Sequence, residues 1–157
     1  MGYRNRLLAG AAALLLGLAA LPAQAQQRQQ QQARPQVSRG EYLATIMDCG
    51  GCHTPGALAG QPDQKARLSG SDIGFGIPGL GYFYPPNLTP DVKTGLGSWS
   101  EQDIIRAMRK GERPDGRMLA PVMPWPSYAM LTDEDARALA RFLKSLPPVS
   151  HAVPSVT

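Results

Sequence analysis

The chain has 157 residues, of which 43% are apolar and 18% are charged, a composition that suits one globular domain. These values exclude a disordered acidic chain and a polytopic membrane protein. The formal charge of +4 suggests nucleic-acid binding at first, but Arg4 and Arg6 lie in an N-terminal export pattern, and without them 14 basic residues face 12 acidic ones. No nucleic-acid partner is therefore expected.

The N-terminus has the pattern of a secretory signal. Arg4 and Arg6 precede an apolar run of 15 residues, 7–21, and Ala23-Gln24-Ala25 offers the small residues that a signal peptidase reads. A membrane-spanning helix needs about 20 apolar residues, so an uncleaved anchor is the weaker alternative. We expect residues 1–25 to be a cleaved signal peptide that directs the protein to the periplasm.

Residues 26–36 are rich in glutamine and contain one alanine as their only apolar residue, so they are predicted to form a flexible linker. The remaining residues, 37–157, are long enough for one compact domain. Its first helix is expected to begin after Ser38, which can form a capping box with Glu41, and to end in the cysteine motif.

The chain has two cysteines, and they stand in the pattern Cys49-Gly-Gly-Cys52-His53. This C-x-x-C-H pattern is the attachment signature of c-type haem, because both thiols can reach one porphyrin edge while the histidine ligates the iron. A disulfide across so short a loop would add little stability, zinc would lack further ligands, and a redox-active pair would lack a β-α-β context. We predict one covalently bound haem c held by Cys49, Cys52 and His53.

The haem iron needs a second axial ligand or stays open to small molecules. The downstream candidates are Met108, Met118, Met123, Met130 and His151. Met123 is preferred, because the three prolines around it predict a stiff extended loop that fixes its thioether at low entropic cost. Met118 is the second choice, Met108 is assigned to a helix core, and His151 is expected to be loosely held in a proline-rich tail.

Between Gly70 and Pro90, glycine and proline are so frequent that a wrapping loop is predicted instead of strands or helices. Five apolar residues of this loop are expected to cover the haem plane: Phe75, Ile77, Leu80, Phe83 and Leu88.

Two further helices are predicted from local signals. One runs from a capping box at Ser100 to Gly111, and the other from Thr132 to Pro147-Pro148. A local positive excess lies in and just after the first of them. It is expected to form a solvated face or to contact haem propionates, and the alternative is that it steers an acidic redox partner. Its basic residues are Arg106, Arg109, Lys110, Arg113 and Arg117.

The sequence resembles the class I cytochromes c, especially the cytochrome c domains of membrane-bound bacterial alcohol and gluconate dehydrogenases. The likeness covers residues 40–149 and rests on C-G-G-C-H-T, P-N-L-T-P-D, T-G-L-G-S-W-S, P-V-M-P-W-P-S-Y and L-T-D-E-D-A-R-A-L. It implies an all-α fold with three main helices and long Gly/Pro loops around one haem, with Met123 at the place of the distal ligand. The family usually has Tyr where Trp125 stands, and its dehydrogenase subunits often carry three such domains.

We interpret the protein as an exported one-electron carrier, not an enzyme, between a periplasmic or membrane-bound dehydrogenase and an oxidase or other cytochrome of the respiratory chain. Membrane association is expected only through such partners or an uncleaved signal. Two alternatives remain: an open-iron haem protein, such as a gas sensor or a peroxidase-like enzyme, and a tethering haem subunit of a dehydrogenase complex. A di-haem peroxidase needs two haem motifs, and this chain has one.

Overall fold

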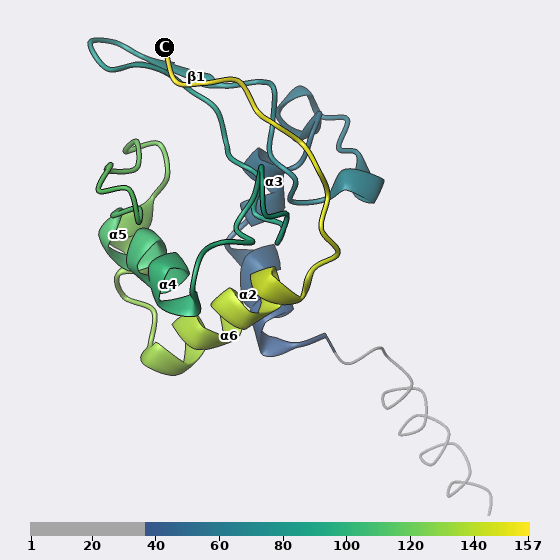
Figure 1. Ribbon diagram of the computed structural model, residues 1–157, viewed down its shortest axis with the longest axis vertical. Helices are drawn as coiled ribbons and strands as arrows, with labels where there is room; N and C mark the ends of the chain where they lie inside the picture. The colour runs from purple at the N-terminus through teal and green to yellow at the C-terminus, as the bar shows by residue number, and fades with distance from the viewer. Residues whose placement is uncertain (1–36) are drawn as a thin grey trace, which may run out of the picture. The chain divides into compact units, whose positions relative to one another are not determined.

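The computed structural model describes residues 37–157, so the expected signal peptide and linker, residues 1–36, lie outside the described residues (Figure 1). The helices of this range are α2 (Arg39–Ile46), α3 (Cys49–His53), α4 (Glu101–Lys110), α5 (Trp125–Tyr128) and α6 (Asp133–Ser145). Two short 3₁₀ helices, η1 (Ala57–Ala59) and η2 (Gln64–Ala66), follow α3. None of the helices described here is long and apolar enough to cross a bilayer.

The helix starts agree with the local capping signals in the sequence. Before α4, the Ser100 hydroxyl accepts a hydrogen bond from the Asp103 amide at 3.1 Å, and the Asp103 carboxylate accepts one from the Ser100 amide at 3.0 Å. The Thr132 hydroxyl caps α6 by accepting a hydrogen bond from the Asp135 amide at 3.1 Å. Gly111 ends α4 in the left-handed region, with φ 73°. These short-range bonds satisfy free groups at the helix ends, which explains why the boundaries could be predicted.

The cap of α2 is half of the expected box. The Ser38 hydroxyl accepts a hydrogen bond from the Glu41 amide at 3.2 Å. The Glu41 carboxylate lies instead 3.8 Å from Arg67, on the segment that follows η2. An ion pair with a distant residue has therefore replaced the reciprocal bond.

The core forms where α6 packs against α2 and α4 (Figure 1). At the crossing of α2 and α6, Gly40 lies against Ala138 and Phe142, and any Cβ at this position would overlap the Ala138 carbonyl. The absence of a side chain therefore lets the two helix backbones approach closely. The buried apolar cluster consists of Leu43, Ala44, Leu68, Leu96, Ile104, Met108, Leu139, Ala140 and Leu143.

Lys144 ties α6 to the turn that precedes α4. Its ammonium group donates to the carbonyl oxygens of Leu96, Gly97 and Trp99 at 3.2, 2.9 and 2.9 Å. A charged donor with three backbone acceptors is fully satisfied although it is partly buried. This contact fixes Trp99 at the start of α4, beside the cavity described below.

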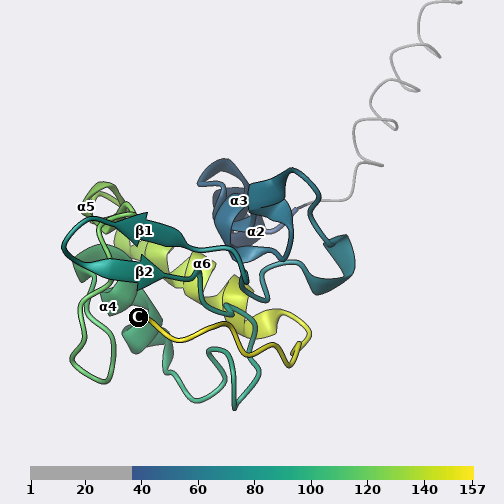
Figure 2. The same cartoon turned by 90° about the horizontal axis from the view of Figure 1, so that it is seen from above.

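The prediction of a strand-free loop after Gly70 is wrong, because this segment contains a β-hairpin. β1 (Phe75–Ile77) pairs antiparallel with β2 (Gly81–Phe83), and Figure 2 shows the two strands side by side. Pro78 and Gly79 make the turn, in which the Leu80 amide donates to the Ile77 carbonyl and Gly79 has φ 77°. Pro-Gly at the centre of a turn is a regular hairpin solution, so the residues that indicated a loop instead close a ladder.

Candidate functional site

The C-x-x-C-H motif forms a short helix of its own, α3, and does not end a longer helix as predicted. Asp48 separates it from α2 with φ 52° and ψ 38°, a left-handed conformation that redirects the chain after Met47. The Asp48 carboxylate occupies the space over Gly51, where any Cβ would overlap it. Nothing in the local sequence period indicated this break, but the motif residues still share one helical turn.

The two cysteines are free thiols, one more buried than the other. Burial raises the pKa of the Cys49 thiol to about 11 and also raises the pKa of Cys52. Zinc ligands and redox-active cysteines work as thiolates, which a lowered pKa favours. Within residues 37–157, no group of three or more His, Cys, Asp or Glu side chains could hold a metal ion.

His53 is buried, and its ring is oriented by the backbone of a distant segment. Its Nδ1 atom lies 2.8 Å from the carbonyl oxygen of Pro86. Because a carbonyl only accepts, Nδ1 carries the hydrogen, and Nε2 keeps its free lone pair. Burial lowers the pKa of His53, against the opposing effect of the Pro86 bond, so the ring stays neutral. A neutral imidazole with one oriented nitrogen is the form that ligates a metal.

Asn87 fixes the segment that orients His53. Its side chain is 1% exposed. The amide nitrogen donates to Thr94 Oγ1 at 3.0 Å and to the Val149 carbonyl at 2.7 Å, while the amide oxygen accepts from the amide and hydroxyl of Thr89 at 2.9 and 2.7 Å. Sequence reasoning missed this role. The signal available was the Asn-x-Thr spacing, which favours a side-chain turn onto the amide two residues later.

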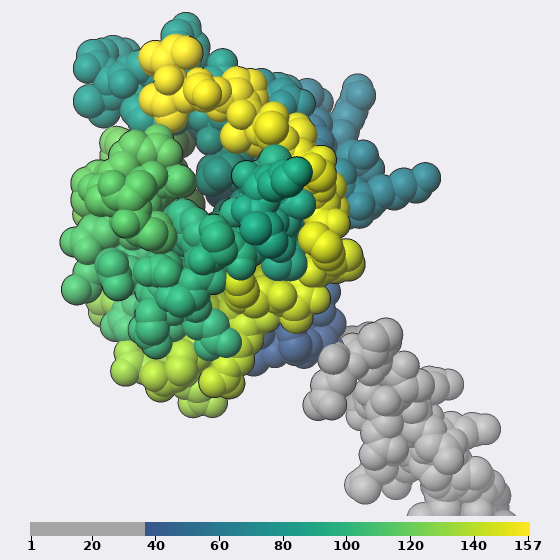
Figure 3. Space-filling model, in the orientation of Figure 1, coloured from purple at the N-terminus to yellow at the C-terminus, as the bar shows by residue number. Residues whose placement is uncertain are grey.

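One cavity of about 730 Å³ joins the parts of the site. This volume lies within the range of about 300–1,000 Å³ that is typical of ligand and cofactor pockets. Cys49, Cys52 and His53 lie in its wall together with Met123, which is distant in sequence. Figure 3 shows the surface hollowed between the green segment around residues 112–123 and the teal and yellow segments opposite it.

The predicted apolar cover is partly correct. Phe75, Phe83 and Leu88 line the cavity, whereas Ile77 and Leu80 do not. Leu80 is 57% exposed, because it lies at the turn of the unpredicted hairpin. Ile77 shares the face of Phe75 in β1 but pairs with Gly81 next to the turn, so the hairpin lines the cavity at its Phe75–Phe83 end.

The structure separates the candidates for the second axial ligand. Met108 is 7% exposed and belongs to the core, Met118 is 51% exposed, and Met130 is 85% exposed. Met108, Met118 and Met123 all line the cavity, whereas Met130 does not. His151 does not line the cavity either. Met123 is therefore the partly buried thioether in the wall that the core does not already use.

The segment around Met123 is a turn and not the extended loop that was predicted. The Met123 amide donates to the Ala120 carbonyl at 3.0 Å, and α5 begins two residues later. Pro126 fits in the first turn of α5 because no helical hydrogen bond is needed there. The hydroxyl of Tyr128, the last residue of α5, donates to the Met47 carbonyl at 3.3 Å. This bond ties the Met123 segment to the chain just before the cysteine motif.

Two arginines add positive charge to the cavity wall, Arg113 and Arg117. The Arg113 guanidinium lies 5.2 Å from the centre of the Trp99 ring and 3.2 Å from the Asp115 carboxylate. Positive charge in the cavity wall is compatible with contact to haem propionates, one of the roles considered for the basic residues. Trp125 does not line the cavity; its buried Nε1 finds no hydrogen-bond partner within residues 37–157.

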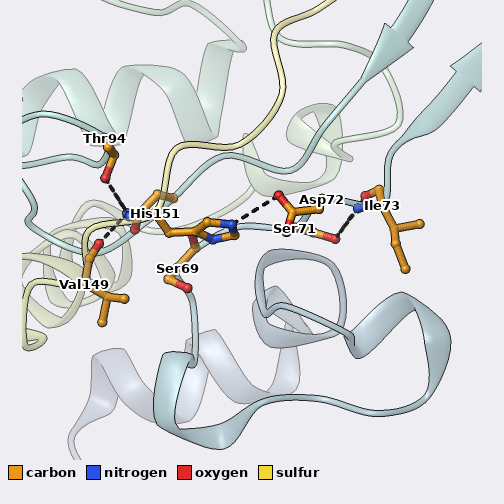
Figure 4. Close-up of polar contacts among 8 residues, drawn as sticks. Ser69, Ser71, Asp72, Ile73, Thr94, Val149 and His151 are labelled. Atoms are coloured by element: carbon orange, nitrogen blue, oxygen red, sulfur yellow. Dashed lines mark hydrogen bonds and ion pairs between the residues drawn. The ribbon is translucent and has the colours of Figure 1, made fainter.

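The prediction that His151 is loosely held is wrong. Its ring nitrogens lie 2.9 Å from the Ser69 carbonyl and 3.1 Å from the Asp72 carboxylate (Figure 4). Its amide donates to Thr94 Oγ1 at 3.1 Å. The proline-rich composition gave no sign of these contacts, because each joins residues that are more than 50 positions apart.

Residues 37–147 match the family model described as cytochrome c. The alcohol dehydrogenase (quinone) cytochrome c subunit of Gluconobacter oxydans is 41% identical over 115 residues, 73% of this chain and 22% of that protein. The gluconate 2-dehydrogenase cytochrome c subunit of Pantoea cypripedii is 41% identical over 117 residues, 74% of this chain and 24% of that protein. The fructose dehydrogenase cytochrome subunit of Gluconobacter japonicus is 37% identical over 122 residues, 77% of this chain and 24% of that protein.

The match therefore spans less than a quarter of the length of each of these three relatives. The match to the family model, over residues 37–147, includes the cysteine motif and extends past α6, which ends at Ser145. The resemblance seen in the sequence is confirmed, and the chain belongs to the cytochrome c family.

Proposed function

We propose that the protein is an exported one-electron carrier in which a single haem c is attached to Cys49 and Cys52, with its iron between His53 and Met123. The observation that carries this proposal is the cavity whose wall contains both thiols, the oriented histidine and a thioether. A single haem is proposed because the chain has one C-x-x-C-H motif and two cysteines in all.

The residues that line the cavity fit a haem c. When bound, haem supplies a one-electron couple between ferric and ferrous iron. His53 offers Nε2 in the neutral state, Met123 offers a weak sulfur donor that favours the ferrous form, and the apolar wall limits the access of water. If His53 and Met123 both held the iron, its ligands would stay the same on reduction, so little reorganisation would oppose electron transfer.

Cationic groups at the cavity complete the fit. The free carboxylates of a haem need donors or positive charge where they approach protein. Arg113 is preoriented for this role, because stacking on Trp99 and the contact with Asp115 restrict its side chain. We therefore assign Arg113 and Arg117, which line the cavity, to the haem. The basic residues that do not line it remain available to a partner: Arg106, Arg109 and Lys110.

The partner that we propose as electron donor is a dehydrogenase, because the similar proteins bear the names of alcohol, gluconate and fructose dehydrogenase subunits. A haem held by these residues would let the chain take one electron from the dehydrogenase and give it to an oxidase or another cytochrome. No bond of a substrate is made or broken by this chain. The proposed location is the periplasm, after removal of residues 1–25.

The experiment is to purify the protein from a periplasm that matures c-type cytochromes and to measure its mass and its redox titration. The proposal predicts a chain beginning at Gln26 with one haem added, a titration that follows a one-electron curve, and a reduced form that does not bind carbon monoxide. Rapid binding of carbon monoxide to the reduced protein would contradict it and favour an open-iron haem protein.

A further inference from the structure

Residues 149–157, which we call the strap, run beyond α6 and return to the cavity. The strap begins at Val149, whose carbonyl accepts from the Asn87 side chain at 2.7 Å and whose amide donates to Thr89 Oγ1 at 3.1 Å. It ends beside β2, where the Tyr82 amide donates to the Thr157 carbonyl at 2.8 Å. Figures 1 and 3 show it in yellow, crossing from α6 to the hairpin.

The middle of the strap is part of the cavity wall. Val153, Pro154, Ser155 and Val156 all line the cavity. The Val153 side chain packs on Gly70, where any Cβ would come within 2.6 Å of it. The amide of Gly70 donates to the His53 carbonyl at 2.8 Å, so the strap lies against the same segment that supports the proposed iron ligand.

The His151 side chain anchors the strap near its start, before the part that lines the cavity. Figure 4 shows its ring lying between Ser69 and Asp72. Nδ1 is 2.9 Å from the Ser69 carbonyl and Nε2 is 3.1 Å from the Asp72 carboxylate. Both partners are acceptors, so each ring nitrogen faces a group to which it can donate a hydrogen bond. The His151 side chain is 22% exposed, which partly shields these bonds from water.

No other polar contact replaces this anchor along the wall. Between His151 and Thr157, the strap makes no hydrogen bond to the rest of residues 37–157. Its position over the cavity therefore depends on apolar packing and on its two ends. One end is the Thr157–Tyr82 contact, and at the other the bonds of the His151 ring act together with the backbone bonds of Val149 and His151.

We propose that His151 is a positioning residue for electron transfer, which holds the strap against the cavity and so keeps water from that side of the haem. Ferric iron carries one positive charge more than ferrous iron, so an environment poor in water disfavours the ferric form and raises the potential. The effect on the potential rests on the proposed haem, whereas the anchoring of the strap does not.

The test compares His151→Ala with Arg39→Ala by two measurements on the holoprotein. Arg39 forms an ion pair with Asp135 at 2.8 Å, between α2 and α6 and apart from the strap. The first measurement is amide hydrogen exchange of Tyr82 in the reduced, diamagnetic protein, since that amide is bonded to Thr157. The second is the midpoint potential. The Leu88 amide, bonded to Leu68, is the internal reference.

In His151→Ala we expect Tyr82 to exchange about tenfold faster, as for the loss of one hydrogen bond to a charged group. The Leu88 amide is expected to stay unchanged and the potential to fall. In Arg39→Ala neither the Tyr82 exchange nor the potential is expected to change. Asp72→Asn alters an exposed side chain and leaves the ring bond to Ser69, so it is expected to give a smaller effect in the same direction, even if His151→Ala fails to fold.

Unchanged Tyr82 exchange in Asp72→Asn and in folded His151→Ala would overturn the proposal, and so would an equal fall of the potential in Arg39→Ala. Failure of the proposed function would be recognised by a different result. In that case the ferric form of the unsubstituted protein would lack the absorption band from methionine sulfur to iron. The Tyr82 exchange would still report on the strap in that case.

Discussion

The Nδ1 atom of His53 lies 2.8 Å from the carbonyl oxygen of Pro86, 33 positions further along the chain. This bond decides which ring nitrogen is free, and it connects the cysteine motif to a segment that the buried amide of Asn87 holds in place. The same amide donates to the carbonyl of Val149, where the strap begins. The proposed iron ligand and the wall of its cavity are therefore supported by one hydrogen-bond network.

The substitution Asn87→Ala should be among the most destabilising polar changes in the chain. It removes bonds to Thr94 and Val149 and leaves buried partners unsatisfied, so we expect a loss of about 2–3 kcal/mol in the free energy of unfolding. Urea unfolding of the holoprotein measures this loss. The control is Gln61→Ala at an exposed position, which should cost no more than about 0.5 kcal/mol. Similar losses in both variants would show that the network has little energetic weight.

The substitution Met123→Ala should open the sixth coordination position of the iron. The reduced variant is expected to bind carbon monoxide, and its potential should be lower than that of the unsubstituted protein, because the sulfur that favours ferrous iron is gone. Absorption spectroscopy and redox titration measure both effects. Met130→Ala, at a side chain that is 85% exposed, should change neither. If Met118→Ala gives the effects expected of Met123→Ala, the ligand is Met118.

The helices could be predicted because their signals are local. Ser100 and Thr132 cap helices whose first bonds span three residues, and Pro147 stops α6 two residues after its end. The hairpin could not be separated from a loop by composition, because Pro78 and Gly79 occur in both. The break at the left-handed Asp48 was also missed, because aspartate tolerates this conformation but does not require it.

The candidate site shows the same division. The cysteines and His53 were identified because their spacing lies within one turn, and that motif is now placed in a cavity of suitable size. Met123 was selected by its proline context, although the extended loop expected there is a turn. Asn87 and His151 were missed or misread, because each makes its decisive contacts with residues far away in the sequence.

The two glycines at 111 and 116 allow backbone strain to be separated from steric overlap. Both have positive φ, 73° and 78°, but a Cβ at Gly111 would lie 2.8 Å from the Trp125 ring, whereas a Cβ at Gly116 meets nothing within 4 Å. Gly116→Ala should cost about 1–2 kcal/mol for the left-handed backbone alone. Gly111→Ala should lower the free energy of unfolding by more than this, because the new Cβ also overlaps the Trp125 ring. Thermal unfolding of both variants measures the difference. Equal costs would mean that the Trp125 ring moves aside freely.

Acid should weaken the turn that carries Thr94. Hydrogen bonds from the hydroxyl and the amide of Thr94 hold the pKa of Asp91 below its ordinary value of 3.8. A carboxylate of lowered pKa stabilises the fold fully above its unfolded pKa, and this contribution is lost as the pH falls through the lower folded value. Asp91→Asn should therefore be less stable at pH 7 but lose less on acidification below about pH 4. Unfolding curves that fall in parallel would contradict this.

The central claim is that His53 and Met123 are the two axial ligands of one haem. The most direct measurement is the absorption spectrum of the ferric protein, matured in a periplasm, in the region of the weak long-wavelength band from methionine sulfur to ferric iron. We predict that the band is present and that it disappears in Met123→Ala. Absence of the band from the unsubstituted protein, together with binding of carbon monoxide by its reduced form, would contradict the claim.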